Sequence, residues 1–402
     1  MKLGQVPRCL IALALAGCAR SASIEPTKRR VIEPPLPVVP ASTSAQPPRE
    51  EGASVGGGGL ESGETPHHDG PLARFHDALR DLDAGRRRSH VRIMWLGDSH
   101  GQADFWTGGV RTALQRRFGH AGPGFMHVGM PNYRHDSVLI DRKGRWRMRP
   151  KGPARTDRWG DGAFGVGGVL SGPYAGDQTV SLELRDSSLA ARTVRWDLCF
   201  KLDAAIDRIE VEFGDERIAL DGSRGGVGAL EHLERTTRGR HRLLVRVTRG
   251  RPLFCGAHAE TDAAASPPGV LVDNLGINGA RYATALAWDE AAWISEVRRH
   301  PPDLFVFEYG ANEAGDATPH PERYRAHAVE LIARARKAVP DASCLVLAPP
   351  DRVDRTRRMP EIVEALRGAA EASGCGFWDT FAAMGGVGSM ATWRESKKGA
   401  PD

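Results

Sequence analysis

Cysteine, aromatic residues and long apolar runs are all scarce in this sequence. The 402 residues include six cysteines, and aromatic side chains make up 6% of the chain. No Cys-x-x-Cys pair or zinc-like Cys/His spacing is present, so we predict neither a metal nor a cofactor. After the N-terminal segment, no apolar run approaches the roughly 20 residues that a membrane-spanning helix needs. What remains is a globular chain with 41% apolar residues, enough for one large domain or two ordinary ones.

Charge of one sign is not in large excess either. Lys and Arg number 55 against 50 Asp and Glu, which gives a net charge of +5. The arginines are interspersed with acids, and the run Arg86 to Arg88 is too short for a nucleic-acid surface. We therefore predict a solvated exterior and no nucleic-acid partner, with weak attraction to anionic cell-surface polymers as the lesser alternative.

The first residues have the pattern of an export signal. Lys2 and Arg8 form a short basic region, residues 9–14 form an apolar core too short to span a membrane, and Leu-Ala-Gly-Cys ends at Cys18. This closing block resembles the lipobox of bacterial lipoproteins. The resemblance implies that Cys18 is lipid-modified and that the chain is exported and anchored to the membrane by its N-terminus. We predict a lipoprotein signal peptide over residues 1–18; an ordinary signal peptide cut near the same place is the alternative.

Residues 19–70 have the composition of a tether. Proline pairs at 34–35 and 47–48 and four glycines at 56–59 stand among Ser, Thr and Glu. Such a segment buries too little apolar surface to offset its conformational entropy. We therefore predict that it is disordered and holds the globular part away from the membrane.

Four cysteines lie beyond the signal, and export permits disulfides. Cys199 and Cys255 stand in strand-like runs of one region, which favours a bridge between them. Cys344 and Cys375 begin two successive predicted strands, and they either pair or are buried as small apolar residues.

Helical and stranded patterns alternate from residue 71 onward. The first part, residues 71–130, has helical spacing over 72–82 and 104–118 around an apolar strand at 91–96. The second part, residues 266–402, alternates strands at 269–275, 304–309, 344–348 and 376–378 with helices at 283–299, 321–338 and 360–373. Nearly continuous apolar strands are typical of a parallel sheet that is covered on both faces. The pattern predicts an α/β fold with a doubly wound, mostly parallel five-stranded sheet.

One apolar stripe follows the second predicted helix. Trp106, Val110, Leu114 and Phe118 recur at intervals of four residues, which draws a single line along a helix.

Residues 131–265 follow a different pattern. Short runs with β-branched residues and alternation, separated by Gly and Asp, lie at 179–184, 193–202, 208–213, 216–220 and 241–248. They predict an inserted β-sandwich or jelly-roll domain. Trp146, Trp159, Tyr174 and Trp196 lie in this region, and we expect them in its core rather than on a ligand platform.

A possible nucleophile follows the first apolar strand. The strand stops at Gly97-Asp98-Ser99, and a helix follows within a few residues. A serine on such a turn holds its hydroxyl in the open, and the helix start offers unpaired N–H groups. Acyl transfer needs both an exposed nucleophile and donors aimed at an oxyanion. Taken alone, Gly-Asp-Ser is also an ordinary turn sequence.

Two more motifs follow later strands. Gly279 stands in Leu-Gly-Ile-Asn-Gly-Ala-Arg at 275–281, and Asn312 stands in Tyr-Gly-Ala-Asn-Glu at 309–313. Active sites of doubly wound sheets lie at the carboxyl ends of the strands, so both should meet Ser99 at one edge. The N–H groups of Ser99 and Gly279 with the Asn312 amide would suffice as an oxyanion hole. A helix-capping glycine and a turn asparagine are the alternatives for each motif alone.

With these blocks in this order, the chain resembles the SGNH (GDSL-type) hydrolases from residue 74 to its end, apart from the insertion. The resemblance implies a flavodoxin-like SGNH fold, Ser99 as nucleophile, and an oxyanion hole made by Ser99, Gly279 and Asn312. Glu313 departs from the family's usual Gly-x-Asn-Asp. Residues 97–105 also resemble the cell-envelope branch of the family. That branch includes peptidoglycan O-acetylesterases with an inserted β-sandwich that resembles a carbohydrate-binding module.

The family's closing block is Asp-x-x-His, which supplies the general base and the Asp that orients it. Residues 385–393 resemble the stretch that leads into this block, so the resemblance implies that Asp402 is the triad Asp. The histidine would lie three residues beyond it. We expect a truncated product, with a hydrolase remnant that has no base as the alternative; without its base the serine keeps only residual catalysis. Four other histidines could substitute as the base, although a lone loop histidine is usually just solvated. They are His100, His127, His135 and His320.

Together these features predict a serine esterase that removes acyl groups, with O-acetyl foremost, from cell-envelope polysaccharide or a small ester. It would be inactive as given if the base is absent. The alternative is a non-catalytic, carbohydrate-binding surface lipoprotein derived from such a hydrolase. An acyltransferase with the same triad is a third option. We predict a monomer.

Overall fold

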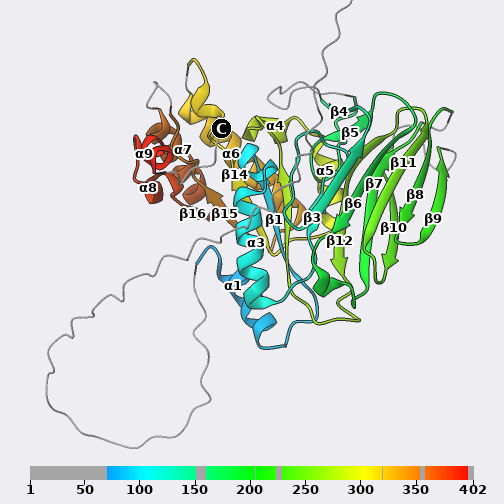
Figure 1. Ribbon diagram of the computed structural model, residues 1–402. Helices are drawn as coiled ribbons and strands as arrows, with labels where there is room; N and C mark the ends of the chain where they lie inside the picture. Colours follow the sequence, from blue (N-terminus) through cyan, green and yellow to red (C-terminus); the bar gives the residue numbers. More distant parts are fainter. Residues whose placement is uncertain are drawn as a thin grey trace, which may run out of the picture. The chain divides into compact units, whose positions relative to one another are not determined.

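The computed structural model describes residues 70–150, 160–203, 205–222, 229–318, 320–353 and 358–396 (Figure 1). The predicted signal with Cys18, the tether up to residue 69, Trp159 and Asp402 lie outside the described residues. Within the described ranges, no helix combines the length and the apolar character that crossing a membrane requires.

Five parallel strands form the central sheet. They are β1 (Val91–Gly97), β13 (Val270–Gly276), β14 (Leu304–Glu308), β15 (Ser343–Leu347) and β16 (Gly376–Trp378). The order across the sheet is β13-β1-β14-β15-β16, and each neighbouring pair is parallel. Numbered along the chain this order is 2-1-3-4-5, the flavodoxin-like order of a doubly wound sheet. The five-stranded sheet has the form that the sequence predicts.

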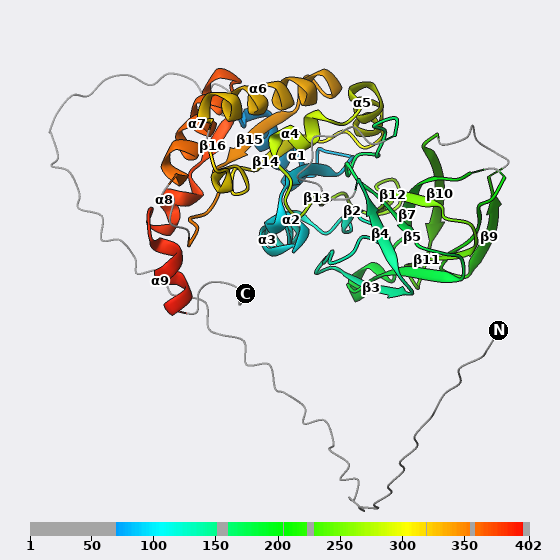
Figure 2. The same ribbon diagram turned by 90° about the horizontal axis from the view of Figure 1, so that it is seen from above.

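Helices cover the two faces of this sheet (Figure 2). On one face Val91, Ile93 and Trp95 share a core with α1 (Ala73–Asp83), and α3 (Phe105–Phe118) packs on the same side. On the other face Met94 and Leu96 belong to the larger core that includes residues of four more helices. These are α4 (Tyr282–Leu286), α5 (Glu290–Arg299), α6 (Pro321–Ala338) and α7 (Met359–Ala372). Alternate residues of β1 therefore serve different faces, as the pleat requires.

The remaining short elements lie near the ends of the strands. They are α2 (Ser99–Gln102), η2 (Glu313–Gly315), α8 (Thr380–Met384) and α9 (Ser389–Glu395).

The single helix predicted over 283–299 is wrong: the segment forms α4 and α5 with a break between them. Asp289 causes the break, because its side chain accepts a hydrogen bond from the Ala292 N–H at 2.8 Å and so caps α5. Its own N–H donates to the Gly162 carbonyl at 3.0 Å, which a continuous helix would not allow.

The buried face of α3 is largely polar. The fully buried residues of this helix are Thr107, Gly108, Arg111 and Gln115. Arg111 Nη1 and Nη2 donate to the two carboxylate oxygens of Asp104 at 2.9 and 2.7 Å. Gln115 Nε2 donates to the carbonyls of Gly122 and Val270 at 2.7 and 3.0 Å. Because these polar groups have partners in the interior, burying them costs little.

The apolar stripe of α3 lines a hollow instead. Trp106, Val110 and Leu114 are half-buried and border a space of about 570 Å³ over the sheet, which Ile93 and Trp378 also line. The hollow is almost wholly apolar in its lining, and Trp378 at its rim is 57% exposed.

The insertion consists of two antiparallel sheets. One has the order β10-β7-β12-β5-β4, with β2 also paired to β12, and the other has the order β3-β6-β11-β8-β9. The strands of the first are β2 (Gly124–Met126), β4 (Trp146–Arg149), β5 (Leu170–Pro173), β7 (Val194–Lys201), β10 (Glu231–Thr237) and β12 (Leu253–Thr261). Those of the second are β3 (Val138–Lys143), β6 (Gln178–Leu184), β8 (Arg208–Phe213), β9 (Glu216–Asp221) and β11 (Arg242–Arg249). A single 3₁₀ turn, η1 (Ser187–Leu189), interrupts the described strands. The β-structure begins at Gly124, before the predicted boundary at residue 131.

The aromatic residues of the insertion divide between core and surface. Trp146 and Trp196 are buried, as expected for a sandwich core. Tyr174 is 46% exposed, so its assignment to the core is wrong. The guanidinium groups of Arg145 and Arg147 lie 5.0 and 5.4 Å from its ring centre, where cation–π attraction makes the exposed position favourable.

Two disulfides are formed among the described residues. One joins Cys199 on β7 to Cys255 on β12, neighbouring strands of one sheet. The other joins Cys344 on β15 to Cys375, which precedes β16. Of the two alternatives for Cys344 and Cys375, the structure has the pair.

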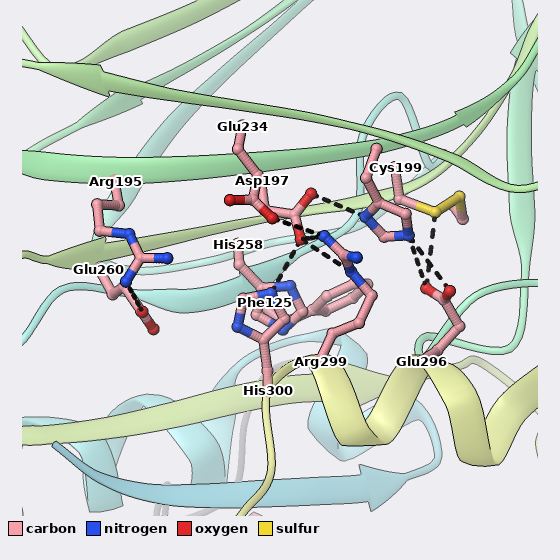
Figure 3. A network of polar contacts seen from close by, with 12 residues as sticks. Phe125, Arg195, Asp197, Cys199, Glu234, His258, Glu260, Glu296, Arg299 and His300 are labelled. Atoms are coloured by element: carbon pink, nitrogen blue, oxygen red, sulfur yellow. Dashed lines mark hydrogen bonds and ion pairs between the residues drawn. A yellow bond between two sulfur atoms is a disulfide. The ribbon is translucent and has the colours of Figure 1, made fainter. Parts of the chain in front are cut away.

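A buried ion-pair network connects the insertion to α5 (Figure 3). The Asp197 carboxylate on β7 lies 2.8 Å from His232 Nδ1 on β10 and accepts from Arg299 Nη2 at 3.0 Å. It also lies 3.0 Å from His300 Nε2. His232 Nε2 also contacts Glu296 on α5 at 3.2 Å. Glu296 and Arg299 lie on α5 and His300 directly follows it, on one face of the central sheet. Asp197 and His232 therefore join the insertion to the central part of the fold.

The protonation of His232 matters most in this network. Burial alone would lower its pKa, but the hydrogen bonds with Asp197 and Glu296 raise the pKa to about 9. Burial would likewise raise the pKa of Asp197, and its hydrogen bonds with His232 and His300 hold the pKa far below the usual range instead. At neutral pH His232 and Asp197 are therefore both charged and form an ion pair.

We expect the network to make stability pH-dependent. The pKa of His232 rises on folding, so its contribution is fully present below about pH 6.5 and is lost as the pH passes through about 9. A shift of this size corresponds to about 3 kcal/mol. Denaturant unfolding at pH 6 and pH 9.5 should therefore show a larger destabilisation by His232→Gln at pH 6. His76→Gln on the exposed face of α1 is the control; an equal effect of His232→Gln at both pH values would contradict the expectation.

Candidate active site

The nucleophile turn leaves the sheet at the carboxyl end of β1. Ser99 is exposed and is the first residue of the single helical turn α2. Asp98 is buried and caps this turn, because its Oδ1 accepts from the His100 N–H at 3.0 Å. Within the described residues, the Ser99 N–H has no protein acceptor. The hydroxyl and the amide of Ser99 are both available to a ligand.

The Gly279 turn stands beside it, after β13. The Ala280 N–H donates to the Ile277 carbonyl at 3.0 Å, and Gly279 between them has φ +77°, a left-handed conformation that favours glycine. Among the described residues the Gly279 N–H also meets no acceptor. Ile277 is tied to the nucleophile strand, since its N–H donates to the Gly97 carbonyl at 3.1 Å.

Asn312 follows β14 and connects the other two motifs. Its Nδ2 donates to the Ala280 carbonyl at 3.0 Å and to Asp98 Oδ2 at 3.4 Å. The first bond fixes the amide against the Gly279 turn, and the second brings it next to the residue before Ser99. A hydrogen bond of 3.4 Å is long, so an ester oxygen above Ser99 could take over this hydrogen. The structure thus brings Ser99, Gly279 and Asn312 to one edge of the sheet.

Buried polar groups that sequence reasoning missed hold the turns together. Gln102 Oε1 accepts from the Asn278 N–H at 2.6 Å, and Gln102 Nε2 donates to the Asn132 carbonyl at 3.2 Å. Asn274 Oδ1 accepts from the Gly276 N–H at 3.1 Å, while Asn274 Nδ2 donates to Asp104 at 3.1 Å. These contacts join α2, β13 and the start of α3, and the spacing of the residues in the sequence gives no signal for them.

Glu313, the departure from the family's motif, is a structural link. Its two carboxylate oxygens accept from the N–H groups of Tyr282 and Gly310, each at 3.1 Å. Burial raises the pKa of Glu313 to about 7. The side chain thereby fixes the start of α4 against the Asn312 loop.

The family comparison agrees with this geometry. Residues 248–396 match the GDSL-like lipase/acylhydrolase family. The fold matches a solved peptidoglycan O-acetylesterase with a TM-score of 0.64 and 23% sequence identity, over 82% of this chain and 88% of that chain. The second part of the chain is thus similar to GDSL-like acylhydrolases, and the fold is similar to that of a peptidoglycan O-acetylesterase.

Other solved structures are more distant from this chain. A family two carbohydrate esterase from Clostridium thermocellum gives a TM-score of 0.24 at 10% identity, covering 60% of this chain and 88% of that chain. A GDSL-like lipase from Parabacteroides merdae gives 0.22 at 16% identity, covering 27% and 54%. A search of curated protein sequences gives no significant match.

Two of the histidines considered as substitute bases are in the wrong place for that role. His127 and His135 are each 2% exposed, so they are core residues and not loop residues in solvent. Burial lowers the pKa of each to about 3, and neither can exchange protons with a substrate that reaches Ser99 from solvent. His320 is exposed and precedes α6.

His100 lies next to the nucleophile but is held by acids. Its Nδ1 lies 2.8 Å from Asp98 Oδ1 and 3.4 Å from Glu308 Oε1. Burial alone would lower its pKa, whereas these two carboxylates raise the pKa to about 10. A histidine that is protonated at neutral pH cannot accept the proton of Ser99, so His100 is not the base.

We expect Asn312 to contribute to catalysis through its amide. In Asn312→Ala, kcat for a small aryl acetate should fall by about 10²–10³, the usual effect of removing one oxyanion donor, with little change in KM. Asn278→Ala is the matched control, because Asn278 is an exposed neighbour that uses only its backbone N–H. Equal rates for the two variants would show that the Asn312 amide does not touch the reacting oxygen.

Proposed function

We propose that this protein is a serine esterase of the SGNH type that removes O-acetyl groups from cell-envelope polysaccharide. The observation that carries the proposal is the contact of Asn312 Nδ2 with both Ala280 and Asp98, which assembles Ser99, Gly279 and Asn312 over one edge of the sheet. An exposed hydroxyl with unpartnered N–H donors beside it is what ester cleavage requires.

In the proposed mechanism, Ser99 Oγ attacks the carbonyl carbon of the ester and its proton passes to a base. The carbonyl oxygen becomes the oxyanion, which accepts from the N–H groups of Ser99 and Gly279 and from Asn312 Nδ2. The bond to the sugar oxygen then breaks, and the released hydroxyl takes up the proton. Water attacks the acetyl-serine in the same way, and acetate leaves. In the family pattern the base is a histidine three residues beyond Asp402, and we propose that Asp402 orients it.

A polar hollow next to the site favours a glycan as substrate. It has a volume of about 810 Å³, and Arg281, which follows the Gly279 turn, is one of its lining residues. Asp316, Arg323 and Glu330 line it as well. Charged hydrogen-bonding groups of both signs suit a chain of sugar hydroxyls and carboxylates better than an apolar acyl chain.

Export to the envelope is part of the proposal. The segment that ends at Cys18 has the pattern of a lipoprotein signal, and two disulfides join residues of the folded part. Stable disulfides are typical of proteins that fold in an oxidising compartment. We propose an exported, lipid-anchored, monomeric enzyme.

Acetate release tests the proposed function. The 402-residue chain and a version extended through an Asp-x-x-His block are incubated with O-acetylated peptidoglycan, and released acetate is measured. The extended version should release acetate, because it carries the Asp-x-x-His block that supplies the general base in the family pattern. Ser99→Ala should release none in either form.

Absence of acetate release from the extended version would overturn the esterase proposal. If that version still bound the glycan in a pull-down without releasing acetate, the carbohydrate-binding alternative would replace it.

The polar hollow predicts a difference between polymeric and small substrates. Arg323→Ala removes a charged group from the hollow, so kcat/KM on the O-acetylated glycan should fall by about tenfold, the loss of roughly one charged hydrogen bond. Hydrolysis of a small aryl acetate should not change. Arg325→Ala, on the same helix but packed against Gly368, is the control. A parallel loss on both substrates would place Arg323 outside the glycan-binding surface.

A further inference from the structure

One histidine stands between two buried carboxylates beside Ser99. His100 Nδ1 is 2.8 Å from Asp98 Oδ1 and 3.4 Å from Glu308 Oε1. Both acids are almost completely buried, at 1% and 2% exposure. Asp98 directly follows β1 and Glu308 ends β14, so the imidazole connects the nucleophile turn to the strand that precedes Asn312.

The surroundings are shaped to hold this arrangement. Glu308 Oε2 accepts from Trp95 Nε1 at 3.0 Å, which fixes the carboxylate from the β1 side. Gly97 lies opposite Glu308 in the parallel register, and a Cβ at Gly97 would come within 2.5 Å of Glu308 Oε2. A side chain at Gly97 would therefore displace the Glu308 carboxylate from this position. The His100 ring stacks on Trp106, with centres 5.4 Å apart and planes at 23°.

A protonated imidazole offsets one of the two negative charges that Asp98 and Glu308 would otherwise place in the interior. Burial and the neighbouring Asp98 carboxylate raise the pKa of Glu308 to about 7, and His100 acts in the opposite direction. Tyr282, Tyr309 and Glu313 are further ionisable groups on the adjoining elements, and all three are buried. Removing His100 would leave the buried carboxylates of Asp98 and Glu308 without their cation, which is the costly way to break an ion pair.

We propose that Asp98, His100 and Glu308 act as one positioning unit, in which an imidazolium between two buried carboxylates keeps the nucleophile turn and Asn312 in working geometry. The imidazolium pairs with Asp98 Oδ1, and Asp98 Oδ2 makes only the long contact to Asn312 Nδ2. Without the imidazolium, Asp98 would bind the Asn312 amide more tightly and withdraw it from the oxyanion. His100 thus acts through Asp98 and Asn312 and has no contact with the substrate in this role.

A double-substitution cycle tests this unit through kinetics. Release of 4-nitrophenol from 4-nitrophenyl acetate is followed in the version extended through the Asp-x-x-His block, for the unsubstituted protein, His100→Gln, Glu308→Gln and the double variant. His100→Gln should lower kcat by about 100-fold with little change in KM, because the lost interaction acts on the oxyanion. Glu308→Gln alone should change kcat by less than threefold, since Asp98 and His100 still balance. The double variant should have a kcat at least tenfold higher than that of His100→Gln, because one of the two carboxylates left without a cation is then neutral.

Several results would overturn the proposal. A double variant no faster than His100→Gln would mean that the side chains do not act as one charge-balanced unit. A kcat for His100→Gln within threefold of the unsubstituted chain would remove His100 from the positioning role. Loss of activity on treatment with EDTA would mean that a metal ion, and not a proton, lies among these three ligands, which are close enough for one.

A second readout does not depend on turnover. Nitrogen NMR of the full chain with labelled histidine, with the His100 signal assigned from His100→Gln, should show a protonated imidazole from pH 6 to pH 8. Glu308→Gln should lower the pH at which His100 loses its proton, whereas a neutral ring at pH 7 would refute the imidazolium. The kinetic arm rests on the proposed esterase function, but the NMR arm does not. Failure on O-acetylated glycan together with a protonated His100 would therefore count against the esterase proposal and not against the imidazolium.

Discussion

The parallel pairing of β1 with β13 and β14 is the constraint on which the site depends. Gly97 lies in register with Gly276 on one side and with Glu308 on the other. The three loops that carry Ser99, Gly279 and Asn312 therefore leave the sheet at the same level. A slip by one residue would turn the side chains of β1 to the opposite face and separate the loops. The register is secured by the small residues at the contact, because a Cβ at Gly276 would collide with the backbone of α2.

The strands and the three motifs could be predicted from sequence because both signals are local. Continuous apolar runs predicted all five strands of the central sheet, and Pro321 marked the first turn of α6. The order of the motifs after successive strands was enough to place them at one edge. The break before α5 was missed, since Asp289 can cap a helix or stand within one, and the deciding contact with Gly162 comes from a distant part of the chain.

The supporting residues could not be predicted because their roles arise from contacts across long sequence separations. Arg111 is buried on α3 because Asp104 accepts both ends of its guanidinium, and hydropathy alone assigns such a residue to the surface. Gln102 and Glu308 hold the site in the same way, through partners far along the chain. Polar side chains of this kind are the part of an active site that a single sequence hides most completely, whereas its exposed serine and glycines are the part that motifs record.

The apolar hollow beside α3 has a practical consequence. A native surface with Trp106 in its wall and a 57% exposed Trp378 at its rim offers a binding place for hydrophobic dyes before any unfolding begins. Thermal melts followed by such a dye would start from a bright folded state, and the transition would be compressed or inverted. Circular dichroism or calorimetry is therefore the sounder way to rank variants of this protein by stability.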